Sequence, residues 1–302
     1  MSEQSKWPAQ PMPLVGVPNF SEGRNERVIG TLEATLGAYA RVLNRHFDDQ
    51  HNRAVYTIAA EPPKLVEALF AGAEQAVEVI DMRHYSGLHP HLGALDVCPV
   101  VWQTPERHDD AVAAARQVAD RIASLGIPVF FFGELATSPE RQERAYFRQG
   151  GPAELARRMA SGELKPDVGP DQPHPTAGAT LVTAREPLVA FNVELETPNP
   201  EIARAIAAEL RESNGGLVGV RAIGLPREDG RTQVSVNVHD PQAVPLAKVV
   251  EKVQRLAAEH GTRPIEAELV GLVPEAAMEG YPKEPRIRNF DPDACVIENV
   301  LG

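Results

Sequence analysis

The stretch Pro187–Leu195 reads P-L-V-A-F-N-V-E-L and opens the region whose pattern is clearest. Its near-continuous apolar character predicts a buried strand. A helix is expected over residues 200–211, where apolar residues recur at helical spacing. Strands at 217–225 and 231–239, a helix at 244–260 and a strand at 265–273 follow. The order βαββαβ is that of a ferredoxin-like split βαβ unit.

The preceding part of the chain shows the same order without repeating the letters. Its expected elements are a strand at 14–18, a helix at 25–37, strands within 39–47 and 53–60, a helix at 62–80 and a strand at 95–102, followed by a helix at 107–125 and a strand at 127–132. We therefore predict an α+β protein with two consecutive ferredoxin-like βαββαβ-type subdomains, whose helices pack on mixed sheets. The predicted division is a disordered tail 1–13, subdomains 14–180 and 181–274, and a C-terminal tail 275–302.

Composition excludes several classes of protein. The 302 residues are 43% hydrophobic and 24% charged, as in a soluble globular protein. No stretch of about 18 apolar residues exists, so no membrane span is expected. The net charge of −12 argues against a nucleic-acid partner. Cys98 and Cys295 are the only cysteines, which leaves no disulfide framework and makes a cytoplasmic location the expectation.

Histidines cluster in the segment His84–Pro99, H-Y-S-G-L-H-P-H-L-G-A-L-D-V-C-P. His84, His89 and His91 lie on a loop broken by glycine and proline, just before an apolar strand. Because histidine titrates nearest to neutral pH, such a loop is a candidate chemical centre. The alternative is that these are surface imidazoles without a role. Asp96, within the following strand, either orients a histidine or has a structural role, and we favour the latter.

Two further segments stand out. Residues 165–178 form a loop containing four prolines, rigid enough to be the wall of a ligand pocket or a stiff spacer. Before it, five arginines are interpreted as a solvated helical face: Arg141, Arg144, Arg148, Arg157 and Arg158.

The motifs resemble those of glutamate formimidoyltransferase, the formiminotransferase part of formiminotransferase–cyclodeaminase. The similarity rests on V-P-N-F-S-E-G at 17–23, H-N-R at 51–53, I-D-M at 80–82, H-P-H-L-G-A-L-D-V-C-P at 89–99, G-A-T at 178–180 and A-F-N at 190–192. It runs in register from about residue 14 to about residue 274. Since the chain stops where a cyclodeaminase would begin, the resemblance implies a stand-alone transferase.

The resemblance implies transfer of a formimino group from N-formimino-L-glutamate to nitrogen 5 of tetrahydrofolate, in histidine degradation. It implies two α/β subdomains with a substrate passage between them, and a homodimer. His89 matches the family's catalytic histidine. The folate-binding loop of the family matches Gly169, Pro170, Asp171, Gln172, Pro173, His174, Pro175, Thr176, Ala177 and Gly178. Some family members have an aromatic residue where this chain has Ala177.

Tetrahydrofolate is expected as co-substrate, and no metal is expected because no metal-ligand spacing is present. A carboxylate assists the histidine in the best-known family members, whereas His46 stands in that register here, with Asp48 nearby. Both substrates carry carboxylates, which arginine binds well. The candidate substrate-binding residues are Asn19, His46, Asn52, Arg53, Arg83, Arg185 and Asn192.

Two other functions remain open at this point. One is formyl transfer between glutamate and folate, with 5-formyltetrahydrofolate handled by the same proton chemistry. The other is a folate-binding protein without catalysis, against which the intact His89 loop argues. In each case the partners are small molecules.

Overall fold

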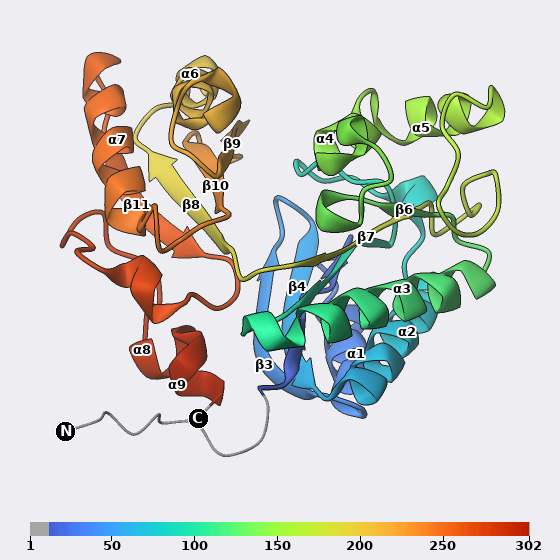
Figure 1. Cartoon of the computed structure of the whole chain (residues 1–302). Coiled ribbons are helices and arrows are strands. Elements are labelled where there is room, and N and C mark those ends of the chain that lie inside the picture. The colour runs from blue at the N-terminus through green and yellow to red at the C-terminus, as the bar shows by residue number, and fades with distance from the viewer. Residues whose placement is uncertain (1–11, 302) are drawn as a thin grey trace, which may run out of the picture. The chain divides into compact units, whose positions relative to one another are not determined.

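A computed structural model describes residues 12–301, so nearly all of the predicted tail 1–13 lies outside the described residues. The chain divides into two compact units between Glu186 and Pro187 (Figure 1). This division lies six residues beyond the predicted boundary at 180/181, because the strand Thr180–Arg185 pairs within the first sheet. The predicted α+β class with two consecutive units is confirmed.

The first unit contains helices and strands in the predicted order. The strands are β1 (Leu14–Gly16), β2 (Asn19–Phe20), β3 (Arg41–Asp48), β4 (Arg53–Ala60), β5 (Leu95–Val101), β6 (Val129–Phe131) and β7 (Thr180–Arg185). The helices are α1 (Glu26–Gly37), α2 (Pro62–Val79), α3 (His108–Ser124), α4 (Arg144–Arg148) and α5 (Gly151–Ala160). A short 3-10 helix, η1 (Met82–His84), precedes the histidine loop.

Strand order in the first sheet is β3, β4, then β1 and β2, then β5, β7 and β6. In place of the single strand predicted at 14–18 there are two short pieces: β1 ends at Gly16 and β2 lies beyond the predicted end, and Pro18 between them cannot donate a ladder hydrogen bond. Both pieces pair with β4 and with β5, in antiparallel fashion. β5, β7 and β6 run parallel, so this sheet is mixed, as predicted.

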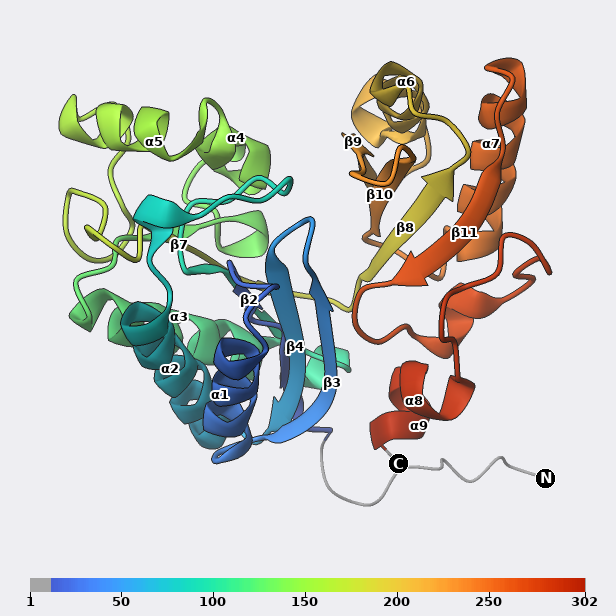
Figure 2. The ribbon, with the colours of Figure 1, turned by 180° about the vertical axis from the view of Figure 1, so that it is seen from behind.

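The two faces of this sheet are covered differently. α1, α2 and α3 lie along one face, as Figure 2 shows, and bury a core that includes Phe20, Tyr56 and Ile122. A second core, with Phe130, Phe147 and others, forms where α4 and α5 pack over the β5–β7–β6 part. The helices α4 and α5 therefore bring their polar residues to the opposite side of the sheet from α1–α3.

The second unit has strand order β11-β8-β10-β9, all antiparallel, which is the ferredoxin-like arrangement. Its elements are β8 (Val189–Leu195), α6 (Pro200–Leu210), β9 (Val220–Pro226), β10 (Thr232–Val238), α7 (Leu246–Glu259) and β11 (Pro264–Leu269), followed by α8 (Pro292–Cys295) and α9 (Ile297–Leu301). The prediction of a mixed sheet therefore holds for the first unit only.

The segment after residue 274 packs against the second unit and is not a separate tail. Ala267 N donates to the carbonyl of Arg286 at 2.8 Å, and Val273 forms a bridge with Val296. Ala277 and Val296 are buried in the core of this unit. The expectation of a C-terminal tail 275–302 is corrected for residues 275–301, because their apolar side chains complete that core.

Candidate active site

The loop that carries His89 is held against the Pro-rich loop by backbone contacts. Ala94 N donates to the carbonyl of Ala177 at 2.9 Å, and Ala179 N donates to that of Leu92 at 3.1 Å. A Cβ on Gly93 would lie 2.2 Å from the Ala179 oxygen, so only glycine permits this approach. The structure thus brings His89's loop together with the end of the predicted folate-binding segment.

The V-P-N-F-S-E-G motif supports the same loop from the other side. Ser21 N donates to the carbonyl of Ala94 at 2.9 Å, and Ser21 Oγ donates to that of Gly93 at 2.8 Å. Asn19, at the start of β2, accepts a 3.4 Å hydrogen bond from Arg53 Nε through its Oδ1. The motif therefore fixes both the backbone below His89 and one side of Arg53.

Asn52 ties three loops together. It has a positive φ of 49°, which asparagine tolerates better than most residues. Its Oδ1 accepts from Gly23 N at 2.9 Å and its Nδ2 donates to the Ser86 carbonyl at 3.0 Å. Both ends of the amide of this candidate substrate-binding residue are thus used within the protein, immediately before Arg53 in the chain.

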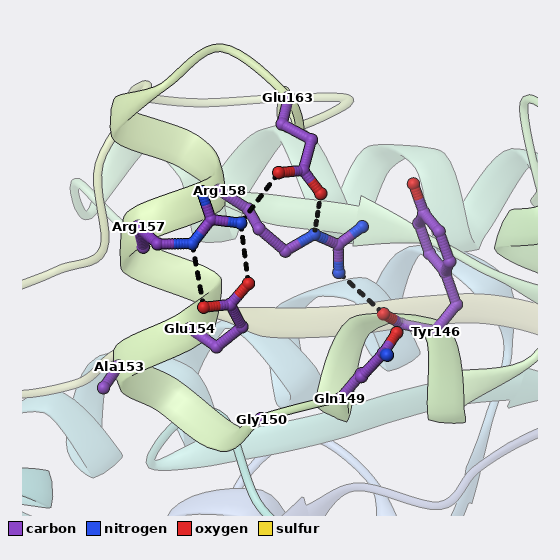
Figure 3. A pocket seen from close by; sticks show the side chains of 8 residues that line it. All are labelled: Tyr146, Gln149, Gly150, Ala153, Glu154, Arg157, Arg158 and Glu163. Carbon is purple, nitrogen blue, oxygen red and sulfur yellow. Dashed lines mark hydrogen bonds and ion pairs between the residues drawn. The ribbon is translucent and has the colours of Figure 1, made fainter.

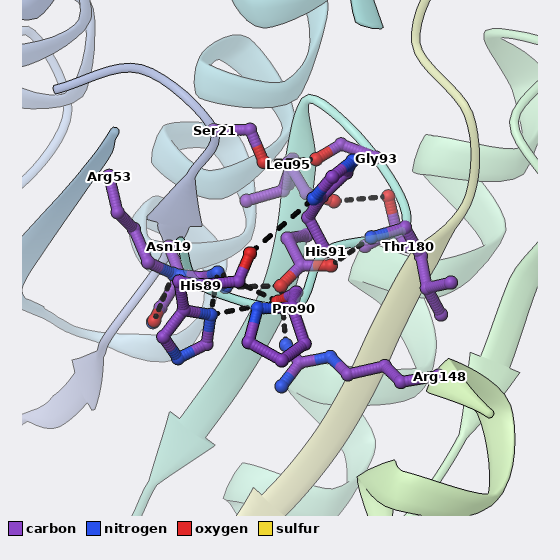
Figure 4. Close-up of polar contacts among 12 residues, drawn as sticks. Asn19, Ser21, Arg53, His89, Pro90, His91, Gly93, Leu95, Arg148 and Thr180 are labelled. Carbon is purple, nitrogen blue, oxygen red and sulfur yellow. Dashed lines mark hydrogen bonds and ion pairs between the residues drawn. The ribbon is translucent and has the colours of Figure 1, made fainter. Parts of the chain in front are cut away.

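Arg53 and Asp96 form a buried ion pair at the centre of the site, and Figure 4 shows the guanidinium of Arg53 beside the ring of His89. Arg53 Nη2 donates to Asp96 Oδ2, and Arg148 Nη2 donates to the same oxygen. The other oxygen, Oδ1, accepts from Leu92 N at 2.7 Å. Burial raises the pKa of Asp96, but the charges of Arg148 and Arg53 and their hydrogen bonds outweigh it and hold this pKa at about 2. Asp96 is therefore a carboxylate.

Arg148 corrects the prediction of a solvated arginine face. It is the last residue of α4, and its guanidinium reaches the fully buried Asp96, 52 residues earlier in the chain. Arg158 is also buried, with 5% of its surface exposed. Asp96 is likewise more than a strand residue, because it joins Arg148 to Arg53.

His89 has both a donor and an acceptor at the same ring nitrogen. Arg53 Nη1 lies 2.7 Å from Nδ1, and the carbonyl oxygen of Pro90 lies 2.8 Å from it. A guanidinium only donates and a carbonyl only accepts. Nδ1 can therefore be held without its proton by Arg53, or with its proton by Pro90. Within residues 12–301 no hydrogen bond is made to Nε2.

Electrostatics keep His89 neutral. Burial lowers the pKa of His89 well below its usual value, and the charges of Arg53 and Arg148 lower it further, with a smaller contribution from His51. The Pro90 carbonyl acts in the opposite direction. The ring of His51 packs edge-on at 6.1 Å from that of His89. At neutral pH the imidazole is thus uncharged and able to accept a proton.

The other candidate histidines lie around this centre. His91 packs against Tyr85, with ring centroids 4.2 Å apart, and burial lowers its pKa. His84 ends η1 and is exposed. His46 lies on β3 opposite Val55, so it shares a sheet face with Arg53, two residues from Val55 on β4.

Two candidate residues, Arg83 and Arg185, are not joined to His89 by any contact within residues 12–301, and a third, Asn192, belongs to the second unit. Arg83 is exposed and pairs with Asp81. Arg185 ends β7 and donates to the Glu186 carbonyl at 2.8 Å. Asn192 lies on β8 of the second unit, where its Nδ2 donates to Glu268 at 3.1 Å.

The predicted folate-binding segment ends in a tight hairpin. His174 and Gly178 exchange backbone hydrogen bonds of 2.8 and 3.0 Å, and Gly178 has φ +70°. His174 Nδ1 accepts from Ala177 N at 3.0 Å, which fixes its ring inside the turn. Burial lowers the pKa of His174. The methyl group of Ala177, where some family members have an aromatic ring, is buried.

A separate polar hollow of about 680 Å³ lies beside α5 (Figure 3). Arg157 pairs with Glu154 and Glu163, and Arg158 pairs with Glu163 at 2.9 Å. Arg158 also donates to the Tyr146 carbonyl. The two arginines and the two glutamates balance, so this hollow offers no net charge to a ligand.

The described part of the chain shows neither a group of metal-binding side chains nor a membrane-spanning helix. Among residues 12–301, no three His, Cys, Asp or Glu side chains are grouped so that they could hold a metal ion. None of the helices described there is long and apolar enough to cross a membrane.

Comparisons with known proteins agree with this architecture. Residues 14–185 match the formiminotransferase domain, N-terminal subdomain, and residues 190–281 match the formiminotransferase domain. Glutamate formimidoyltransferase of Streptococcus pyogenes serotype M1 is 39% identical over 94% of this chain and 97% of its own length. Glutamate formimidoyltransferase of Thermoplasma acidophilum is 36% identical over 87% of this chain and 88% of its own length. The formimidoyltransferase-cyclodeaminase of Rattus norvegicus is 36% identical over 87% of this chain and 50% of its own length.

Two units with these matches, and a half-buried histidine that contacts an arginine, are those of a two-subdomain transferase. The chain belongs to the formiminotransferase family, which confirms the resemblance seen in the sequence motifs and the prediction that the protein is an enzyme.

Proposed function

We propose that this enzyme transfers a formimino group from N-formimino-L-glutamate to nitrogen 5 of tetrahydrofolate, with His89 as general acid and base. The products are 5-formiminotetrahydrofolate and L-glutamate, in histidine degradation. Support comes from relatives named glutamate formimidoyltransferase that match nearly the whole chain. Tetrahydrofolate is a co-substrate in this proposal, and no metal takes part in it.

The reaction requires two proton movements at one place. Nitrogen 5 of the folate attacks the amidine carbon and forms a C–N bond, giving a tetrahedral intermediate. Nitrogen 5 then loses its proton, and the glutamate nitrogen gains one as its bond to the same carbon breaks. A single group that alternates between base and acid serves both movements, and such catalysis contributes about 10²–10⁴-fold.

The observation that carries the proposal is the pair of partners at His89 Nδ1. When Pro90 holds a proton on Nδ1, Nε2 is a base. When Nε2 takes the proton of nitrogen 5, the ring becomes an imidazolium whose Nδ1–H still donates to the Pro90 carbonyl, and the Nε2 proton is then returned to the glutamate nitrogen. The lowered pKa of His89 keeps the base form available at neutral pH, and the Pro90 carbonyl, which raises this pKa, stabilises the protonated form.

The segment Gly169–Gly178 is proposed as the folate-binding wall. Its prolines stiffen it, and its hairpin hydrogen-bonds to the loop of His89. A pterin ring needs a rigid apolar slot with a few polar edges. We propose that this wall places nitrogen 5 near Nε2 of His89, and that Asn19 and His46 are candidates for polar contacts to the substrates.

The test is His89→Ala, assayed by formation of 5-formiminotetrahydrofolate. We expect kcat to fall by about 10²–10⁴-fold with an unchanged circular dichroism spectrum, since the ring supplies proton transfer and not the fold. His84→Ala, in the same segment but exposed, is the matched control and should retain activity. Near-wild-type transfer by a folded His89→Ala variant would show that another group moves the proton.

The donor and the assembly are tested separately. Parallel assays with N-formimino- and N-formyl-L-glutamate distinguish formimino from formyl transfer. Tetrahydrofolate binding without turnover of either donor would instead identify a non-catalytic folate-binding protein. We also propose a homodimer in the cytoplasm, which sedimentation velocity and cell fractionation would test.

A further inference from the structure

The arginines around His89 outnumber the carboxylates. Arg53 and Arg148 both pair with Asp96. Arg144, one turn before Arg148 on α4, and Arg185, at the end of β7, have no carboxylate partner within residues 12–301. Four guanidinium groups therefore share one acidic side chain in this part of the molecule.

The positive charges of Arg53, Arg148 and Arg185 all act on Arg144. Burial lowers the pKa of Arg144 to about 9, with further lowering by Arg148, Arg53 and Arg185, while Asp96 opposes them. Its guanidinium stacks over the ring of Phe132, 5.9 Å from the centroid. Burial likewise lowers the pKa of Arg185 to about 10.

These arginines lie at different points along the direction of the parallel strands. Asp96 lies at the start of β5, and Arg185 pairs with Val101 at its end. Five strand residues correspond to about 16 Å. Arg144, over Phe132 just after β6, lies on the α4 side of the same strands. The charge thus extends from the neighbourhood of His89 toward the far end of β5.

A partly buried cation without a counter-charge is costly, so proteins ordinarily pair it. The hollow beside α5 shows this, since Arg157 and Arg158 meet two glutamates there. The missing negative charge near Arg144 is best supplied by a ligand, and guanidinium groups bind carboxylates bidentately.

We propose that Arg144 and Arg185 form the binding site for the carboxylates of a glutamyl group. This inference rests on the proposed function and names the group that the enzyme recognises. Two sources carry this chemistry: the donor N-formimino-L-glutamate and the glutamyl tail of tetrahydrofolate.

The experiment compares Arg144→Gln and Arg185→Gln with Arg116→Gln. Arg116 is a matched control, because it stacks on Phe131 at 5.3 Å from the α3 side of the sheet and is exposed. We expect the KM of the recognised substrate to rise about 10–100-fold in the first two variants, with kcat within about threefold of wild type. Arg116→Gln should change neither constant, and Arg144→Lys should recover part of the loss.

Binding measurements distinguish the two sources and do not depend on turnover. If the donor is recognised, calorimetric binding of L-glutamate weakens in Arg144→Gln. If the folate tail is recognised, wild type prefers tetrahydrofolate to tetrahydropteroate, which lacks glutamate, and the variant loses this preference. If wild type binds these compounds but transfers no formimino group, the proposed function fails while the carboxylate site stands.

Thermal unfolding distinguishes a ligand-binding arginine from one that stabilises the fold. Replacing a stabilising arginine would lower the unfolding midpoint, whereas replacing an unpaired one should not. Removing an unpaired cation relieves repulsion from Arg148 and Arg53, so the unfolding midpoint of Arg144→Gln should stay equal or rise. A lowered midpoint, or unchanged binding and KM for both substrates in Arg144→Gln and Arg185→Gln, overturns the proposal.

Discussion

Two groups of arginines in the first unit differ in how their positive charges are balanced by carboxylates. Beside α5, Arg157 and Arg158 meet Glu154 and Glu163, and the charges balance (Figure 3). Beside His89, Arg53 and Arg148 (Figure 4) both pair with Asp96, and Arg144 and Arg185, farther along the parallel strands, add two further charges.

The two groups also differ in exposure. The side chain of Glu163 is 50% exposed, whereas that of Asp96 is fully buried. Exposed ion pairs contribute little because water screens them, and buried pairs depend on every partner being present. The comparison indicates that the group beside α5 is a surface network of which Arg158 is the buried member. The group that includes Arg53 and Arg148 holds an excess of positive charge beside the candidate site.

The largest expected effect comes from removing the carboxylate that holds the buried group together. Asp96→Asn leaves Arg53 and Arg148 without a counter-charge in a buried site, and should lower the free energy of unfolding by about 3–5 kcal/mol. Urea denaturation followed by circular dichroism measures this. A loss below about 1 kcal/mol would show that water or another group compensates the two arginines.

The second-largest effect is expected from acid, which should weaken the buried ion pairs of Asp96 with Arg53 and Arg148. The pKa of Asp96 is held at about 2, below its usual 3.8, so its contribution to stability is complete above pH 4 and is lost as the pH falls through 2. The integrated contribution is roughly 2 kcal/mol. Denaturation between pH 5 and pH 2 should therefore show a steeper loss of stability in wild type than in Asp96→Asn. Equal slopes would contradict the depressed pKa.

Arg148 should act on His89 through charge. The groups facing His89 are Arg53, Arg148 and His51, and the positive charge of Arg148 lowers the His89 pKa. Arg148→Gln removes that charge, so this pKa rises and the acidic limb of the kcat/KM profile moves to higher pH. Arg148→Lys retains the charge and should keep the limb close to wild type. A limb that stays in place in Arg148→Gln would leave Arg148 with a purely structural role.

The smallest effect is expected in the balanced group. Glu163→Gln breaks contacts to Arg157 and Arg158 that water already screens. Its melting temperature should stay within about 2 °C of wild type, and its transfer kinetics should not change. A large change in kcat would show that the hollow beside α5 communicates with Arg148 through α4.

Local pattern was enough for most of the fold. Apolar periodicity placed β8 to β11 and α6 and α7, because a strand or helix that packs on one side must repeat its apolar residues at the period of that element. The segment after residue 274 escaped this reasoning. Its helices, Pro292–Cys295 and Ile297–Leu301, are too short to show a period, and its packing depends on apolar contacts with distant residues.

By itself, the sequence determined the family and the choice of His89, since both rest on residues that are neighbours in the chain. Only the tertiary structure decided which charges meet. Asp96 joins Arg53 across 43 residues and Arg148 across 52. α4 has five residues, too few to reveal which face of a helix is buried. Pairing of charges depends on strand order and helix placement, which no local spacing encodes. For this reason the arginines predicted to form a solvated helical face include Arg148, which pairs with Asp96 in the candidate site.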